Sequence, residues 1–238
     1  MHLFYTPDIH SAFYTFGKDD SRHCSKVLRL NQGDRVTLTN GKGSFYHSEI
    51  IDDNPKATAV KVVEQEEVTR PWPQHIHLAI APTKNVSRTE WAVEKCTEMG
   101  VDEITPVRCH HSERTILKHE RTERIITAAV KQSLKAWHPV LNEMIPLKTL
   151  LEKPFEGEKY IAYIDKKNTD LLVNMVTCKN DVLILIGPEG DFSEEEVHQA
   201  IAKGYKPVSL GNSRLRSETA AVKACSTIHF VNEYKQKQ

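Results

Sequence analysis

The sequence contains no run of apolar residues close to the ~20 that a membrane-spanning helix requires. Its first residues, MHLFYTPDIH, lack a charged segment followed by an apolar core, so we expect no signal peptide and no membrane partner. Lysine and arginine number 32, as do aspartate and glutamate, so no net charge attracts polyanions to the whole molecule. Any nucleic-acid site must therefore come from local patches of basic residues.

Cysteine is scarce and scattered, with five residues and no CxxC pair, so neither a structural zinc nor a disulfide framework is predicted. A reducing, cytoplasmic location fits this composition best. Histidine is more frequent, but the spacings of His75/His77 and of His110-His111 do not place two imidazoles on one helix face, so we expect no metal. The GxGxxG, GxxxxGK[ST] and GxSxG signatures are also absent, so no dinucleotide or P-loop enzyme is supported.

Residues 1–68 have the pattern of short strands. Asn40-Gly41 lies between two apolar-rich runs and predicts a tight hairpin in which both turn residues have positive φ. Another strand is predicted in ATAVKVVE, and a short helix near residues 21–30. We therefore predict a small β-barrel or sandwich. The stretch EQEEVTRPWP, acidic and then proline-flanked, marks a domain boundary before residue 74.

From residue 74 to residue 238 the pattern alternates between strands and helices. Strands are predicted at 75–81, 103–108, 160–165, 182–187 and 207–211. Helices are predicted from Ser87, where Glu90 would close a capping box, to Gly100; over 118–135; from Ser193, with Glu196, to Gly204; and from about Glu218. This order predicts an α/β domain with a mostly parallel sheet.

Two loops in this second domain have the composition of ligand loops. LILIGPEGDF (183–192) is a buried strand that ends in two glycines, a proline and a carboxylate, and LGNSRLRSETAAVKA (210–224) repeats the order of strand end, glycine, polar loop and helix start. Ligands of open α/β sheets bind at the carboxyl ends of the strands. In the alternative interpretation, the glycines only relieve strain and the alanines only permit close helix packing.

Basic residues gather in two places. Arg22, Lys26 and Arg29 are spaced for one face of the short helix, and residues 108–138 hold seven lysines or arginines against three acids. Such local stripes suit phosphate contacts. The alternative is a solvated helix face with ion pairs between neighbouring turns.

Taken in order, the quoted loops and three further segments resemble the RsmE family of small-subunit rRNA uracil-N-3 methyltransferases, in the SPOUT class. The further segments are SRHCSKVLRLNQGDRVTLTNGKG, TKNVSRTEWAVEKCTEMGV and ITPVRCHHSERT. The resemblance covers nearly the whole chain. The sequence departs from the family pattern at Asp191, where a glycine is usual, near Asn212-Ser213, where a proline–arginine pair is usual, and at Leu134-Lys135, where a glycine–arginine pair is usual.

The resemblance implies a PUA-like RNA-binding β-barrel over 1–68 and a SPOUT methyltransferase domain over 74–238 that contains a deep trefoil knot. It further implies a homodimer that uses S-adenosylmethionine to methylate N-3 of a uridine in small-subunit rRNA or in the assembling small subunit. The expected cofactor residues are Ile164, Ile186, Gly187, Pro188, Glu189, Gly190, Leu210, Gly211, Leu215, Arg216, Thr219 and Ala220. Two alternatives stay open: a knotted methyltransferase with another RNA target, and a catalytically inactive RNA-binding assembly factor.

The chemistry suggests which residues catalyse the reaction. Uracil N-3 carries a weakly acidic proton, so the protein must stabilise negative charge on the uracil carbonyls. Arginine suits this task because it stays charged; Arg216 is the first candidate and Arg88 and Arg114 are the others. Glu218 or Glu189 would accept the proton, unless they only complement a helix dipole or cap their own loop. For RNA contact we expect Arg22, Lys26, Arg29, Arg124, Lys131 and Lys135.

Overall fold

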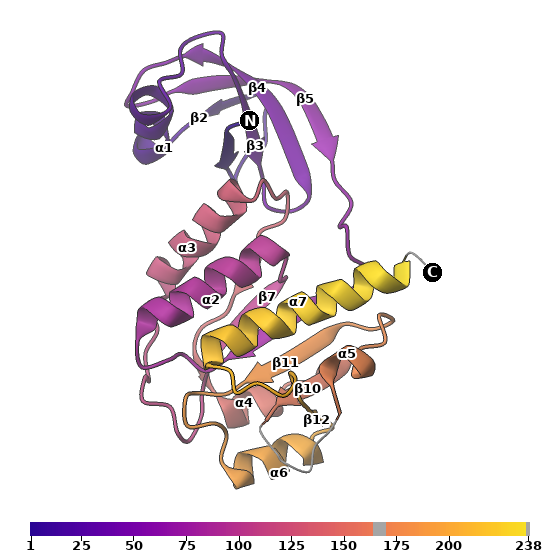
Figure 1. Cartoon of the computed structure of the whole chain (residues 1–238). Coiled ribbons are helices and arrows are strands. Elements are labelled where there is room, and N and C mark those ends of the chain that lie inside the picture. Colours follow the sequence, from indigo (N-terminus) through magenta and orange to yellow (C-terminus); the bar gives the residue numbers. More distant parts are fainter. Residues whose placement is uncertain (164–169, 237–238) are drawn as a thin grey trace. The chain divides into compact units, whose positions relative to one another are not determined.

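The computed structural model describes residues 1–163 and 170–236 (Figure 1). The chain forms two compact units, one made of Met1–Arg70 and Val130–His138 and the other of Pro71–Ala129 and Pro139–Gln238. Among the described residues, no helix combines the length and the apolar character needed to cross a membrane. All five cysteines are free thiols.

The first unit is built on a five-stranded sheet with the order β1-β3-β4-β5-β2. Its strands are β1 (Leu3–Tyr5), β2 (Phe13–Thr15), β3 (Arg35–Thr39), β4 (Ser44–Asp52) and β5 (Ala59–Glu67). β1 runs parallel to β3, and the other neighbours are antiparallel. Phe4, Leu38, Ile50 and Val60 are fully buried in its core. The prediction of a small β unit at the N-terminal end is therefore confirmed.

The hairpin between β3 and β4 forms where Asn40-Gly41 predicts it, but its turn is different. Asn40 Oδ1 accepts hydrogen bonds from the backbone N–H of Lys42 (2.8 Å) and of Ser44 (3.2 Å), which closes a longer loop. The positive φ values belong to Gly41 (71°) and Gly43 (99°), and Asn40 does not have one. The prediction of a two-residue turn was therefore wrong, because the asparagine side chain replaces the backbone hydrogen bonds of a tight turn.

The short helix predicted near residues 21–30 is two elements. The α-helix α1 (Lys18–Arg22) passes directly into the π-helix η1 (His23–Val27), and Arg29 then adopts a left-handed φ of 57°. A π-helix has more residues in each turn than an α-helix. The spacing that would align Arg22, Lys26 and Arg29 on one α-helical face therefore does not apply.

Residues 130–138 complete the first unit by packing on the β3–β4 loop. The Gly43 N–H donates to the Ala136 carbonyl at 3.0 Å, and Lys42 and Trp137 form an antiparallel bridge. A Cβ on Gly43 would lie 2.4 Å from the Trp137 ring, so only glycine fits there. The Arg70 guanidinium lies 4.5 Å from the centre of the same ring. Nothing in the sequence pattern places this segment in the first unit.

The second unit contains a seven-stranded sheet in which every described strand pair is parallel, as predicted. The order is β12-β10-β11-β6-β7-β8, and β9 also pairs with β7. The strands are β6 (Ile76–Ile80), β7 (Glu103–Arg108), β8 (Val140–Leu141), β9 (Ile145–Pro146), β10 (Glu158–Ala162), β11 (Val182–Ile186) and β12 (Lys206–Val208). Every residue of β6 and β11 is buried, which is typical of strands covered on both faces.

Helices cover both faces of this sheet (Figure 1). The second unit contains α2 (Val86–Met99), α4 (Leu147–Leu151), α5 (Leu172–Met175), α6 (Glu194–Ala202) and α7 (Ser217–Gln236), and α3 (His119–Gln132) begins in the second unit and ends in the first. The residues of α4 and α6 pack with Leu183 and Leu185 on one face. On the other face α7 packs against β6, β11 and α2, and Cys96 of α2 and Cys225 of α7 are both fully buried there.

Three of the predicted helix ends are confirmed and one is wrong. Ser193 caps α6 in a full capping box with Glu196, and Gly204 (φ 85°) and Gly100 (φ 107°) follow the last turns of α6 and α2. The N-cap of α2, however, is Asn85, whose side chain accepts from the Ser87 N–H. Asparagine and serine are both good N-caps, and the chain begins the helix at the earlier of the two.

Candidate active site at the carboxyl edge of the sheet

The candidate site is the edge of the parallel sheet where β6, β7, β10, β11 and β12 end. The loops that follow these strands begin at residues 81, 109, 163, 187 and 209. Because the strands are parallel, all five loops leave from the same edge, and both loops with ligand-like composition are among them.

The loop after β11 is closed by its own backbone. Gly187 and Pro188 are buried, whereas Glu189 and Gly190 are exposed. The Asp191 N–H donates to the Pro188 carbonyl at 3.0 Å, and Asp191 has a left-handed φ of 61°. Glycine adopts this conformation without cost and aspartate more readily than most residues. The departure at Asp191 therefore preserves the path of the loop.

Glu189 and Arg114 hold neighbouring loops together. Glu189 Oε1 accepts from the Lys84 N–H at 3.0 Å, in the loop after β6. Arg114, from the loop after β7, donates from Nη2 to the Lys84 carbonyl at 2.7 Å and from Nε to the Thr83 carbonyl at 3.1 Å. The guanidinium of Arg114 is therefore committed to the backbone, whereas Glu189 Oε2 has no hydrogen bond within the described residues.

His111 and Lys84 belong to the site, although the sequence reasoning did not assign them to it. A Cβ on Gly190 would lie 3.0 Å from His111 Cβ, so the glycine permits the close approach of the loops after β7 and β11. His111 Nδ1 lies 3.1 Å from the Asp191 carbonyl oxygen. Lys84 pairs with Glu113 at 2.7 Å, and this hydrogen bond raises the pKa of the lysine. Only their positions just after strands could have indicated either residue.

Arg88 and Glu218 form an ion pair between α2 and α7. Glu218 lies in the first turn of α7 and is 7% exposed. Its Oε1 atom lies 3.8 Å from Arg88 Nε, and its buried Oε2 atom has no hydrogen-bond partner among the described residues. Such an oxygen is uncommon, because a buried polar atom normally finds a partner. The helix dipole and Arg88 both favour the carboxylate at this position.

Arg216 immediately precedes α7, and its side chain is exposed. Its carbonyl accepts from the Ala220 N–H at 2.8 Å, but its guanidinium makes no hydrogen bond or ion pair within residues 1–163 and 170–236. Of the three candidate catalytic arginines, Arg216 is therefore the one whose guanidinium has neither a hydrogen bond nor an ion pair among the described residues.

The remaining cofactor candidates lie along the loop after β12 and the start of α7. Gly211 has a left-handed φ of 111°, and a Cβ there would lie 3.1 Å from Lys223 Nζ. Leu210, Leu215 and Ala220 are half-buried, and Thr219 is exposed. Ile164 lies outside the described residues.

The candidate RNA-binding residues differ in exposure and in whether their charged groups already have a partner in the protein. Arg22, Lys26 and Arg29 are exposed. Lys131 instead pairs with Asp20 at 3.1 Å and lies 5.4 Å from the Phe4 ring centre, so it helps hold residues 130–138 in the first unit. At the start of α3, Lys118, Glu120, Arg121 and Arg124 line a hollow.

The histidines form no metal site with other described residues. Within the described ranges, no group of three or more His, Cys, Asp or Glu side chains is arranged to hold a metal ion. His77 is buried, and its Nε2 atom lies 2.7 Å from Thr105 Oγ1. Burial lowers the pKa of His77 to about 4, in spite of the nearby Glu103.

Comparison with protein families gives two matches that follow the two parts of the chain. A family described as an RNA methyltransferase domain matches residues 70–229, and a family described as an RNA methyltransferase PUA domain matches residues 16–63.

Individual proteins match over almost the full length. The chain is 32% identical to ribosomal RNA small subunit methyltransferase E of Synechocystis sp. over 89% of this chain and 71% of that protein. A probable rRNA-methyltransferase from Porphyromonas gingivalis is 44% identical, with a TM-score of 0.92 over 99% of this chain and 100% of that one. The Neisseria gonorrhoeae ribosomal RNA small subunit methyltransferase E, solved bound to S-adenosyl methionine, is 26% identical, with a TM-score of 0.87 over 97% of this chain and 98% of that one.

Proposed function

This chain belongs to the ribosomal RNA small subunit methyltransferase E family, and from that membership we propose that it methylates N-3 of a uridine in small-subunit rRNA. S-adenosylmethionine is the methyl donor and supplies a methyl group already activated on a sulfonium. The observation that carries the proposal is the joining of the loops after β6, β7 and β11 at one sheet edge, beside an exposed arginine at the start of α7.

The residues at this edge fit the cofactor. Gly187, Gly190 and Gly211 have neighbours 3.0–3.1 Å from the position of a Cβ, so the backbone lies close to the surrounding side chains. Leu210, Leu215 and Ala220 add small or apolar surface beside them. Backbone groups and apolar side chains of this kind suit a nucleoside that is held mostly through main-chain contacts. We assign the cofactor to the loops after β11 and β12 and to the start of α7.

Arg216 has the role that the reaction demands most. As the N-3 proton leaves, negative charge develops on the two carbonyl oxygens of uracil. A preorganised guanidinium stabilises that charge, and the free donors of Arg216 can reach a ligand without breaking an existing bond. Arg216 is therefore the proposed catalytic residue, whereas Arg114 holds the loops after β6 and β7 together.

The two candidate carboxylates, Glu189 and Glu218, differ in burial. Glu189 is exposed and keeps one oxygen free of hydrogen bonds within the described residues, so it can accept the N-3 proton from a bound uracil. Glu218 is almost completely buried, so a substrate atom does not reach it directly. We assign Glu218 to holding Arg88, whose half-exposed guanidinium lies at the start of α2.

RNA contact is assigned to basic residues in both units. Arg22, Lys26 and Arg29 are exposed in the first unit, and Lys118, Arg121 and Arg124 surround the hollow at the start of α3 in the second. Arg121 is also bound to Glu90, with Nη2 2.8 Å from Oε2, which fixes its orientation. Fixed cations of this kind suit phosphates of a folded RNA.

The proposal extends to assembly and location. Phe230 and Tyr234, which stack on one another along α7, are 61% and 57% exposed and would be covered by a second copy of the chain in a homodimer. We further propose that the second unit contains the trefoil knot of the SPOUT class, and that the enzyme acts in the cytoplasm, where small subunits assemble.

The direct test uses small ribosomal subunits from a strain that lacks the gene. The purified protein and S-adenosylmethionine with a labelled methyl group are added, and the modified nucleoside is identified by mass spectrometry. We expect 3-methyluridine at one position of the small-subunit rRNA. Another methylated nucleoside would establish a different target, and S-adenosylmethionine binding without transfer to any RNA would establish an inactive assembly factor.

A further inference from the structure

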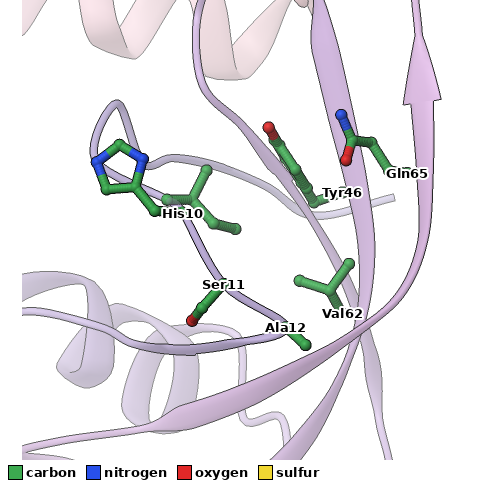
Figure 2. A pocket seen from close by; sticks show the side chains of 7 residues that line it. His10, Ser11, Ala12, Tyr46, Val62 and Gln65 are labelled. Carbon is green, nitrogen blue, oxygen red and sulfur yellow. The ribbon is translucent and has the colours of Figure 1, made fainter.

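A pocket of about 360 Å³ opens in the first unit, between the chain that precedes β2 and strands β4 and β5 (Figure 2). The labelled residues that line it are His10, Ser11, Ala12, Tyr46, Val62 and Gln65. None of them is a lysine, an arginine or an acid. The pocket lies outside the candidate active site and is not explained by it.

The pocket combines an apolar wall with a polar rim. Ile9, which is 5% exposed, lines it together with Ala12 and Val62. Tyr46 and Gln65 are direct cross-strand partners on β4 and β5, and Figure 2 shows the phenol and the amide projecting to the same end of the pocket. A flat ligand with polar atoms along one edge matches this arrangement.

Hydrogen-bonding capacity remains at that end. Gln65 Nε2 donates to Glu67 Oε1 at 2.7 Å, and the second N–H and the amide oxygen of Gln65 make no hydrogen bond to any described residue. The Tyr46 hydroxyl accepts from Asn40 Nδ2 at 3.4 Å and keeps its own proton to donate. A glutamine amide that offers a donor beside an acceptor complements the edge of a nucleobase.

Charge at the polar end of the pocket disfavours a phosphate there. Glu67 lies two residues after Gln65 on β5, so the two side chains share one face of the sheet, whereas Glu66 points to the other face. The Glu67 carboxylate is held in place, since its Oε1 atom accepts from Gln65 Nε2 at 2.7 Å and from Ser44 Oγ at 2.9 Å. This fixed negative charge repels an RNA phosphate, whereas a neutral base carries no charge to be repelled.

We propose that this pocket binds one unpaired nucleobase of the RNA, packed against Tyr46 and hydrogen-bonded along its edge by Gln65. The proposal rests on the proposed function, because the RNA substrate supplies the base. Unpaired bases are recognised by stacking on aromatic rings and by bonds to their exposed edges, which are the two interactions that this pocket offers. The first unit thereby reads a single-stranded feature of the RNA, in addition to its phosphates.

The test compares two RNA probes that carry the same number of phosphates. One is a ten-nucleotide single-stranded RNA of mixed sequence, and the other is an abasic strand of ten ribose phosphates. Affinity is measured by fluorescence anisotropy with the full-length protein. We expect tighter binding of the probe that carries bases.

Two variants address the pocket without touching the core. Gln65→Leu removes the donor and the acceptor, and Ala12→Phe fills the space from an exposed position. Each should weaken binding of the base-carrying RNA by about tenfold, on the scale of one lost base contact, and leave the abasic strand unaffected. Val63→Ala removes an exposed side chain of the same strand that does not line the pocket, and it should bind both probes like the parent.

Two results overturn the proposal: an unchanged preference for bases in Ala12→Phe, or equal loss with both probes. An equal loss would assign these residues to the general RNA surface, and unchanged RNA binding would leave the pocket to a protein ligand. Methyl transfer to small subunits is measured on the same preparations. If the parent protein transfers methyl groups and both pocket variants bind RNA normally, only the pocket proposal is wrong. If the parent protein transfers no methyl groups, the proposed function is wrong.

Discussion

Arg88 Nε lies 3.8 Å from Glu218 Oε1, and this ion pair joins the first turns of α2 and α7. The second oxygen of the same carboxylate is buried and unpartnered within the described residues. The pair therefore couples a buried charge to a guanidinium that is partly in solvent. The predictions below begin with this pair.

Arg88→Ala and Glu218→Gln should each slow single-turnover methyl transfer by about tenfold or more, because the first removes the guanidinium and the second removes the charge that orients it. The double variant should be no slower than the slower single variant, since the two residues act as a unit. Rates and melting temperatures are measured together. Lys95→Ala, which breaks exposed ion pairs with Glu94 and Glu98 on the same helix, is the control. Strictly additive effects of the two changes would show that Glu218 does not act through Arg88.

Arg216→Ala should lower the single-turnover transfer rate by about 10²-fold, comparable to the loss of one donor that stabilises an oxyanion. Affinity for S-adenosylmethionine and for RNA should change far less. Arg216→Lys should restore only part of the rate, because lysine lacks the planar fork. If Arg216 instead holds the knot or the dimer, Arg216→Ala lowers the melting temperature or dissociates the dimer, and the surviving dimers keep the normal rate.

Glu189→Gln tests the proton acceptor. Glutamine still offers an oxygen to the Lys84 N–H, so the loops stay joined, but its amide does not accept the N-3 proton. We expect a slower transfer that recovers as the pH rises and hydroxide takes the proton, whereas the parent rate should depend less on pH. A parallel pH profile in the two proteins would exclude Glu189 as the base.

Gly187→Val should abolish S-adenosylmethionine binding and leave the circular dichroism spectrum near that of the parent. A Cβ at Gly187 already lies 3.1 Å from the Phe192 ring, so a valine forces the loop to move. Isothermal titration calorimetry measures the affinity. The matched control is Gly17→Ala, where a Cβ meets nothing within 4 Å. Normal affinity in the valine variant would remove the loop after β11 from the cofactor site.

Charge reversal of Arg22, Lys26 and Arg29 together should weaken RNA binding and flatten its salt dependence. Each lost phosphate contact lowers the log–log salt slope by roughly 0.7 to 0.9. S-adenosylmethionine affinity should not change. Reversal of Arg35, Lys56 and Lys61, also exposed in the first unit, makes the same change of net charge as a control. Equal slopes in the two triple variants would mean that RNA senses only the overall charge of the unit.

The sequence predicted the strands of the second domain well, because their signal is local. The run of apolar residues in β11 reads as a strand buried on both faces, and Ser193 with Glu196 marks the start of α6 without knowledge of any other residue. The loop at Gly187–Gly190 was found for the same reason, since it lies between these two clear elements.

The roles of the site residues could not be predicted in the same way, because they depend on contacts between distant segments. Arg114 and Arg216 have the same chemistry in the sequence, but only the fold shows that the donors of Arg114 are used by the backbone of residues 83 and 84. Glu189 and Glu218 likewise differ by burial, which no local pattern contains. The π-helix at His23–Val27 also has no recognisable local signal.

Residues 130–138 make the two units interleaved in the sequence. Because this segment belongs to the first unit, the polypeptide passes between the units three times, after residues 70, 129 and 138. A gene fragment that ended near residue 70 would encode a β unit without Ala136 and Trp137. The Gly43 N–H of the β3–β4 loop would then lose its acceptor, the Ala136 carbonyl. The two parts are thus not exchangeable modules: recombination at the linker would separate the first unit from residues 130–138, so the two parts are expected to be inherited together.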